Sequence, residues 1–167
     1  VLQMPAPFDL PFYVVGNFPY NISTQIIFKV LEWGSLVQGV TGMFQKEVAQ
    51  RIAAPPGSKT YGVTSVLVQA FYRVHYLFDV APGCFTPPPK VMSGIIELEP
   101  LAQQADFRSR KAFFTLVKAA FGQRRKTLRN AVKHLFDAHE LQDEIFNRRA
   151  EQLAVEDFAK LSFRMKQ

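Results

Sequence analysis

The chain has 167 residues, 48% of them hydrophobic, which is enough for one domain, or one domain with a small appendage, around its own core. Its 20 Lys and Arg against 14 Asp and Glu give a net charge of +6, which favours an anionic partner such as nucleic acid or a membrane surface. The single cysteine excludes an intrachain disulfide and a cysteine-based metal site, the histidines show no metal-ligand spacing, and no apolar run could span a bilayer. We therefore expect a cytoplasmic protein with no metal and no membrane segment.

The first hundred residues alternate between predicted strands and helices. The apolar run 12–15 predicts a buried strand of a parallel sheet that ends at Gly16, and apolar residues at helical spacing predict a helix over 22–31. Further strands are expected over 39–45, 74–80 and 92–98, and a further helix over 46–53. The β-branched residues of 62–72 also allow a strand, but their apolar spacing favours a helix. The connector 81–91 contains three consecutive prolines, which cannot join a strand ladder, so we expect an ordered extended loop.

Every predicted element after Pro100 is a helix. These helices are expected over 107–122, 128–136, 141–146 and 158–165. The fold class is therefore α/β, with a sheet over residues 1–100 followed by a small all-helical domain over 101–167. The chain begins at Val1 rather than at a methionine, in the middle of a sequence pattern, and we expect it to be a fragment.

The loop Asn17-Phe18-Pro19-Tyr20 directly follows the first predicted strand, where open α/β sheets bind their ligands. An Asn oxygen and a backbone carbonyl can together accept both hydrogens of an adenine N6 amine and aim its lone pair at a sulfonium methyl group. Pro19 restricts the backbone, and Tyr20 offers an aromatic face to an extruded base. Taken alone, these four residues agree equally well with a turn that simply ends a strand.

A cluster of cations marks the second half of the chain. Arg125, Arg129 and Lys133 are spaced to share one face of a helix, and Arg124 and Lys126 flank that face. Scattered charges usually form a solvated surface. Five cations within ten residues, with no acidic residue among them, instead favour contacts with RNA phosphates.

Four sequence stretches together indicate a family. The segment 16–23 (GNFPYNIS) resembles motif IV of the ribosomal RNA adenine dimethyltransferases, which include small-subunit dimethyladenosine transferases and large-subunit erythromycin-resistance methylases. Three further stretches resemble the small-subunit branch in family order: QKEVAQR (45–51), FTPPPKV (85–91) and FGQRRKTLRN (121–130). The erythromycin-resistance branch lacks the last stretch, so the resemblance favours the small-subunit adenine-N6,N6 dimethyltransferases.

The resemblance implies a fold and roles for individual residues. The fold would be the second half of a Rossmann-like S-adenosylmethionine methyltransferase sheet, followed by a helical domain that binds RNA or the ribosome. Asn17 would accept from the adenine N6 and lie beside the cofactor, with Phe18 also at the cofactor. The Pro19 carbonyl would be the second acceptor. Tyr20 and Phe85 would stack on the two faces of the adenine.

The implied activity is dimethylation of two adjacent adenines in a 3′-terminal hairpin of 16S ribosomal RNA, during biogenesis of the small (30S) subunit. The methyl donor would be S-adenosylmethionine, no metal would be needed, and the protein would be a monomer. This chain lacks the family's Gly-rich loop and its acidic cofactor residues. We therefore expect the chain by itself to bind the cofactor poorly and to be inactive.

Two other functions remain open at this point. A non-catalytic RNA-binding or ribosome-assembly factor, or a relative of the mitochondrial transcription factors, could share the fold, although the intact Asn17, Pro19, Tyr20 and Phe85 argue against a loss of catalysis. A DNA adenine methyltransferase is the second alternative. Those enzymes usually carry Asp-Pro-Pro-Tyr or Asp-Pro-Pro-Phe, whereas this chain has Asn and Phe at the first two positions.

Overall fold

The structure is a computed structural model that describes residues 3–167. The described chain forms two compact units. Unit 1 contains the described residues up to Ala53 and the segment Phe71–Ala102, and unit 2 contains Ala54–Ala70 and Gln103–Gln167. The segment Ala54–Ala70 thus groups with the C-terminal helices, although it precedes the division at residue 100 expected from the sequence.

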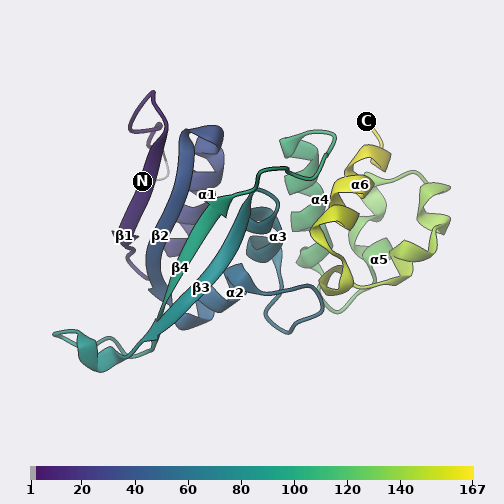
Figure 1. Cartoon of the computed structure of the whole chain (residues 1–167). Coiled ribbons are helices and arrows are strands. Elements are labelled where there is room, and N and C mark those ends of the chain that lie inside the picture. The colour runs from purple at the N-terminus through teal and green to yellow at the C-terminus, as the bar shows by residue number, and fades with distance from the viewer. Residues whose placement is uncertain (1–2) are drawn as a thin grey trace. The chain divides into compact units, whose positions relative to one another are not determined.

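Unit 1 is a mixed α/β structure with a four-stranded sheet in the described chain (Figure 1). Its elements are β1 (Phe12–Asn17), α1 (Ser23–Trp33), β2 (Val37–Gln45), α2 (Lys46–Ala53), β3 (Tyr72–Val80) and β4 (Ser93–Pro100). The strand order is β1-β2-β4-β3; β1 is parallel to β2, whereas β4 is antiparallel to both β2 and β3. The strands and helices predicted for this part are confirmed, with small differences at their ends.

The prediction that β1 is buried is wrong for one of its faces. Tyr13 and Val15 are 74% and 77% exposed, whereas their neighbours along the strand are partly buried. Successive side chains of a strand point to opposite faces, and Figure 1 shows α1 and α2 on the same side of the sheet. On the covered side Phe12 packs edge-on against Trp33 of α1, with ring centroids 5.7 Å apart.

Unit 2 is helical in the part that the structure describes. Its α-helices are α3 (Val63–Gln69), α4 (Arg110–Gly122), α5 (Leu128–Val132) and α6 (Val155–Arg164). The helices predicted over 128–136 and 141–146 are wrong in detail. The first is α5 followed by a 3₁₀ turn, Lys133–Leu135, and the second is two 3₁₀ turns, Glu140–Gln142 and Glu144–Asn147. The Asp143 side chain accepts from the Ile145 N–H at 3.0 Å, a local bond that competes with helix formation.

Aromatic residues form the core of unit 2. The rings of Tyr61 and Phe158 both contact Phe121, each with centroids 5.9 Å from the Phe121 ring. Tyr61 is fully buried, and its hydroxyl donates to the Leu153 carbonyl at 2.7 Å. Burial raises the pKa of Tyr61 far above its usual value, so the phenol stays neutral and remains a donor. This bond ties the segment Ala54–Ala70 to the C-terminal part of unit 2.

We predict that Tyr61→Phe lowers the free energy of unfolding by about 1 kcal/mol, because the buried Leu153 carbonyl loses its donor. Urea denaturation followed by circular dichroism measures this change. Tyr13→Phe removes the hydroxyl of an exposed tyrosine and is the matched control, with an expected change below about 0.5 kcal/mol. Equal losses in the two variants would contradict the prediction.

Candidate active site

The ends of the described strands of unit 1 meet at one edge of its sheet. β1 and β2 end there at Asn17 and Gln45, and β4 begins there at Ser93, opposite Val80 at the end of β3. Residues that are directly paired across strands point to the same face, so Asn17 lies beside Met43, and Gln45 lies beside Ser93. Asn17, Met43 and Ser93 therefore share one face at this edge.

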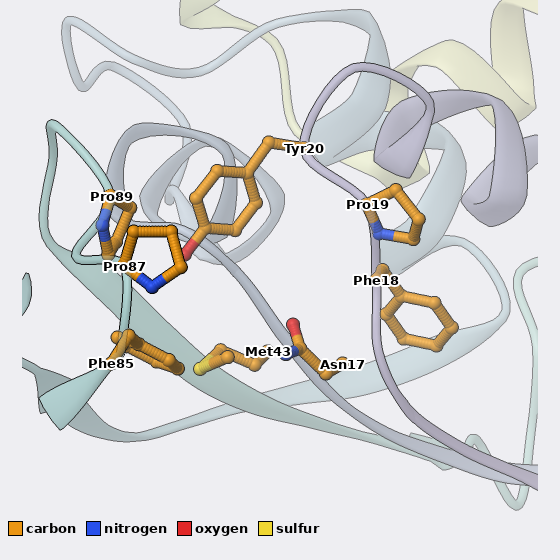
Figure 2. A pocket seen from close by; sticks show the side chains of 8 residues that line it. All are labelled: Asn17, Phe18, Pro19, Tyr20, Met43, Phe85, Pro87 and Pro89. Atoms are coloured by element: carbon orange, nitrogen blue, oxygen red, sulfur yellow. The ribbon is translucent and has the colours of Figure 1, made fainter.

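A hollow of about 260 Å³ opens at the same edge. Its lining residues within the described chain are Asn17, Phe18, Pro19, Tyr20, Met43, Phe85, Pro87 and Pro89. Figure 2 shows the Tyr20 ring across this space from Phe85, with Met43 and Asn17 following Phe85 along the other side. The structure therefore brings together Asn17, Pro19, Tyr20 and Phe85, the residues expected from the sequence to surround the target base.

Asn17 presents its side-chain amide to the hollow. The residue is exposed, and its amide makes no hydrogen bond with any other residue that the structure describes. In Figure 2 the amide oxygen points toward the side of the hollow on which Tyr20 lies. The donors and the acceptor of this amide are thus available to a ligand.

Phe18 is turned away from Tyr20 and Phe85 and packs into the core of unit 1 (Figure 2). Its ring contacts Phe44, with centroids 5.0 Å apart. The ring fits because Gly42 has no side chain: a Cβ there would lie 2.1 Å from Phe18 Cε2. The Phe18 N–H also donates to the Met43 carbonyl at 3.2 Å. Phe18 therefore anchors the loop to β2, and its place at a cofactor stays a prediction.

Tyr20 is held at both ends. Its hydroxyl is hydrogen-bonded to the Ser93 hydroxyl, and its backbone carbonyl accepts from the Ser23 hydroxyl at 3.3 Å. The turn that leads into α1 is closed by the Ile22 N–H, which donates to the Pro19 carbonyl at 3.2 Å. A carbonyl oxygen has two lone pairs, so Pro19 keeps one acceptor position for a ligand.

The loop that carries Phe85 joins β3 to β4 and extends beyond the sheet (Figure 1). Within it the Phe85 N–H donates to the Pro82 carbonyl at 3.2 Å. At its base Lys46 donates to Asp79 at 2.8 Å, and the Tyr76 hydroxyl donates to the same carboxylate. These bonds lower the pKa of Asp79, whereas burial, together with the Asp79 carboxylate, raises the pKa of Tyr76 to about 12. The network joins the ends of β2 and β3, from which the loop departs.

The prediction that Arg125, Arg129 and Lys133 share one helix face is wrong. α4 ends at Gly122 and α5 begins at Leu128, so Arg125 and Lys126 lie in the turn between the two helices. Lys133 begins the 3₁₀ turn that follows α5. Glycine disfavours continuation of a helix, and Gln123 has a non-helical backbone (φ −128°, ψ 66°), which ends the helical register at this point.

Two of the five cations bind protein carbonyls. Arg124 donates to the carbonyls of Lys59 at 2.6 Å and of Tyr61 at 3.3 Å. Arg129 donates through Nε to the Leu141 carbonyl at 2.9 Å. The cations of the cluster that are exposed and make no ion pair with another described residue are Arg125, Lys126 and Lys133.

Met43 and Ser93 are part of the site, and the sequence did not indicate either of them. Met43 reaches the hollow because β2 pairs with β1 in the register that places it beside Asn17. Ser93 takes part through the Tyr20 hydroxyl. No motif marks these two residues, and only the pairing register of the strands could have indicated them.

Some kinds of site are not found in the described part of the chain. In residues 3–167 no three His, Cys, Asp or Glu side chains are grouped so that they could hold a metal ion. No helix in this range is both long and apolar enough to cross a bilayer. Cys84, which lies directly before Phe85 in the loop between β3 and β4, is a free and exposed thiol.

Comparison with known sequences identifies similar proteins. The profile of the family described as "Ribosomal RNA adenine dimethylase" matches residues 6–167. The chain is 54% identical over 152 residues to "Ribosomal RNA small subunit methyltransferase A" of Cytophaga hutchinsonii, an alignment that covers 90% of this chain and 59% of the relative. It is 51% identical over 159 residues to the protein of that name from Bacteroides fragilis, covering 94% of this chain and 58% of the relative. The chain thus spans less than two thirds of the length of these relatives.

Solved structures show the same fold. A dimethyladenosine transferase from Plasmodium falciparum superposes with a TM-score of 0.83 at 25% identity, covering 98% of this chain and 71% of that chain. The 23S rRNA methyltransferase ErmE superposes with a TM-score of 0.74 at 20% identity, covering 99% of this chain and 69% of that chain. The second likeness concerns the fold alone. Both agree with a mixed α/β fold, and the first shows this fold in a Rossmann-like dimethyltransferase.

We predict that Gly42→Ala displaces the Phe18 ring and lowers the free energy of unfolding by between about 1 and 3 kcal/mol, the usual cost of overpacking. Urea denaturation measures the loss. Gly83→Ala is the control, because a Cβ at Gly83 meets no atom within 4 Å. If Gly42→Ala were as stable as the unchanged chain, Phe18 would not occupy the position described.

Proposed function

Because this chain belongs to the ribosomal RNA adenine dimethylase family, we propose that it supplies the target-base side of an enzyme that dimethylates adenine N6 amines in small-subunit ribosomal RNA. The sequence resemblance narrows this proposal to two adjacent adenines in a 3′-terminal hairpin of 16S ribosomal RNA, within the small subunit. The chain spans 59% of the C. hutchinsonii relative, so the activity is proposed for the complete enzyme.

The observation that carries this proposal is the shared hollow at the end of β1 and β2. Tyr20 and Phe85 come from distant parts of the sequence, and both line this hollow together with Asn17. Two aromatic rings that face one space can hold a planar base between them. A base held there would present its edge to the Asn17 amide.

The polar groups of the hollow suit an exocyclic amine. The N6 lone pair of adenine is delocalised into the ring, so the amine is a poor nucleophile in its planar form. The Asn17 side-chain oxygen and the free lone pair of the Pro19 carbonyl can each accept one N6 hydrogen. Holding both hydrogens favours a more tetrahedral nitrogen and aims its lone pair. The contribution of these residues is therefore mainly positioning.

S-adenosylmethionine, the methyl donor implied by the family, would supply an electrophilic methyl group on a sulfonium. Asn17 fits a place beside it, because its exposed amide makes no bond to another described residue. The Phe18 side chain lies in the core, packed against Phe44. The resemblance also places Phe18 at the cofactor, and we propose that it acts there by holding the backbone that carries the Asn17 amide.

The exposed cations of unit 2 are the proposed contacts to the RNA backbone. Arg125, Lys126 and Lys133 present their charges to solvent, which allows them to approach phosphates. Arg124 and Arg129 already donate to protein carbonyls. They retain their positive charge and add to the local potential, while each uses part of its donor set to hold unit 2 together.

The catalytic role is tested with the completed chain, meaning this chain joined to the part of the C. hutchinsonii relative that the alignment leaves out. Transfer of labelled methyl groups is measured on unmodified small ribosomal subunits, naked RNA and DNA, and we expect the small subunit to be the best substrate. Asn17→Ala and Tyr20→Ala should each reduce transfer on the order of 100-fold or more, because the amine is no longer positioned. RNA affinity should stay nearly unchanged.

Asn147→Ala, at an exposed asparagine of unit 2, is the matched control and should keep full activity. RNA binding without methyl transfer by the unchanged completed chain would instead support a non-catalytic assembly factor. Preferred methylation of DNA would support the DNA-modifying alternative. The 167-residue chain by itself should bind S-adenosylmethionine weakly in calorimetry.

We predict that Arg125→Ala combined with Lys126→Ala weakens RNA binding by the completed chain and flattens its dependence on salt. Each lost phosphate contact should reduce the slope of log K against log salt by about 0.7 to 0.9. Binding is measured by fluorescence anisotropy over a series of salt concentrations. Lys160→Ala, at an exposed lysine of α6, controls for the loss of charge alone. If Lys160→Ala changed RNA binding as much per removed charge as the double variant does, net charge and not this turn would govern binding.

A further inference from the structure

Two serines that are almost completely inaccessible to solvent contact the same tyrosine. Ser93 is 0% exposed and Ser23 is 1% exposed. Few other polar side chains of the described residues are buried to this extent. Ser93 is hydrogen-bonded to the Tyr20 hydroxyl, and Ser23 donates to the Tyr20 carbonyl at 3.3 Å. Buried hydroxyls need partners, and both of these serines find theirs on Tyr20. The backbone and the far end of the Tyr20 side chain are thus both fixed.

Ser93 lies at a well-fixed point of the sheet. It is the first residue of β4, and it pairs with Gln45 on one side and with Val80 on the other. The preceding residue, Met92, accepts from the Lys46 N–H at 2.9 Å. A hydroxyl on this backbone has little freedom to move, so it can serve as a rigid anchor.

The same residue also ends the loop that carries Phe85. The chain runs from Phe85 through the prolines and residues 90–92 into β4, whose first residue is Ser93. The bond between Ser93 and Tyr20 therefore links the two segments that supply the aromatic walls of the hollow. Without this bond, the Tyr20 side chain could rotate about its two side-chain torsions into the space that it borders.

We propose that Ser93 is a positioning residue, which keeps the Tyr20 ring at the distance from Phe85 that an inserted base requires. This inference rests on the proposed function, because it takes the base that enters the hollow to be an adenine. The hollow is then open before the RNA binds, and the ring loses no further freedom when the base enters. Ordering a side chain in advance lowers the cost of binding and improves the alignment of the reacting groups.

The first test does not depend on enzymatic activity. The chain contains five tyrosines, and labelling them with 3-fluorotyrosine gives each its own ¹⁹F resonance, with the Tyr20 signal assigned from Tyr20→Phe. Ser93→Ala should shift the Tyr20 signal toward that of a freely rotating ring and leave the others in place. The control is Ser162→Ala, at a 0% exposed serine that donates to the Ala159 carbonyl at 2.6 Å and should leave Tyr20 unchanged. An unshifted Tyr20 signal in Ser93→Ala would overturn the inference.

The second test uses methyl transfer by the completed chain. Ser93→Ala and Tyr20→Phe should each reduce kcat between about 10-fold and 100-fold, the cost of a misplaced reacting group, while the KM for RNA changes less than about twofold. The double variant should be no worse than either single variant, because all three lack the same bond. Tyr20→Phe removes the same bond and leaves Ser93 in place, so it still tests the inference if Ser93→Ala does not fold. Additive losses, or an unchanged kcat in Tyr20→Phe, would count against the inference.

The two tests separate this inference from the proposed function. If the completed chain transfers no methyl groups while the ¹⁹F spectra show the expected shift, the proposed function fails and the positioning role of Ser93 stands. If the completed chain is active and Ser93→Ala matches it in kcat and in its spectrum, the function stands and the positioning role fails.

Discussion

The contact between the Phe18 ring and Gly42 is the constraint on which the arrangement of the site depends. The ring is buried against Phe44, and Gly42 leaves the space that it needs. Neighbouring side chains of an extended segment point to opposite sides, so burial of Phe18 turns the Asn17 amide toward the hollow. A hydrophobic contact thus determines the direction of a polar group.

The hollow depends on segments that are remote in sequence and are joined by the sheet. The end of β1 supplies Asn17, the loop after it supplies Tyr20, and the loop between β3 and β4 supplies Phe85. Their relative position follows from the strand order β1-β2-β4-β3, in which β2 lies between β1 and β4. Because the ladder hydrogen bonds fix these strands relative to one another, two loops that are far apart in the sequence can form a defined binding space. The bond between Tyr20 and Ser93 completes this connection.

The basic residues between Arg124 and Lys133 have two roles, because they carry positive charge and some of them also bind the backbone of unit 2. Arg124 holds the backbone at Lys59 and Tyr61, and Arg129 holds the backbone at Leu141. Only part of the cluster is therefore free for phosphates, although all of its members raise the positive potential. Long-range attraction to a polyanion depends on charge and not on a regular helix, so the break between α4 and α5 leaves the positive potential of this segment in place.

Local patterns in the sequence determined where most strands and helices of this protein lie, and that Asn17 stands where the first strand ends. These features depend on side-chain periodicity and on turn residues, which act over a few neighbours. Only the tertiary structure decided the exposure of Tyr13 and Val15, the break between α4 and α5, and the place of Met43 and Ser93 beside the hollow. Strand order, register and side-chain packing decide these features, and they arise from contacts between residues far apart in the chain, which no local period encodes.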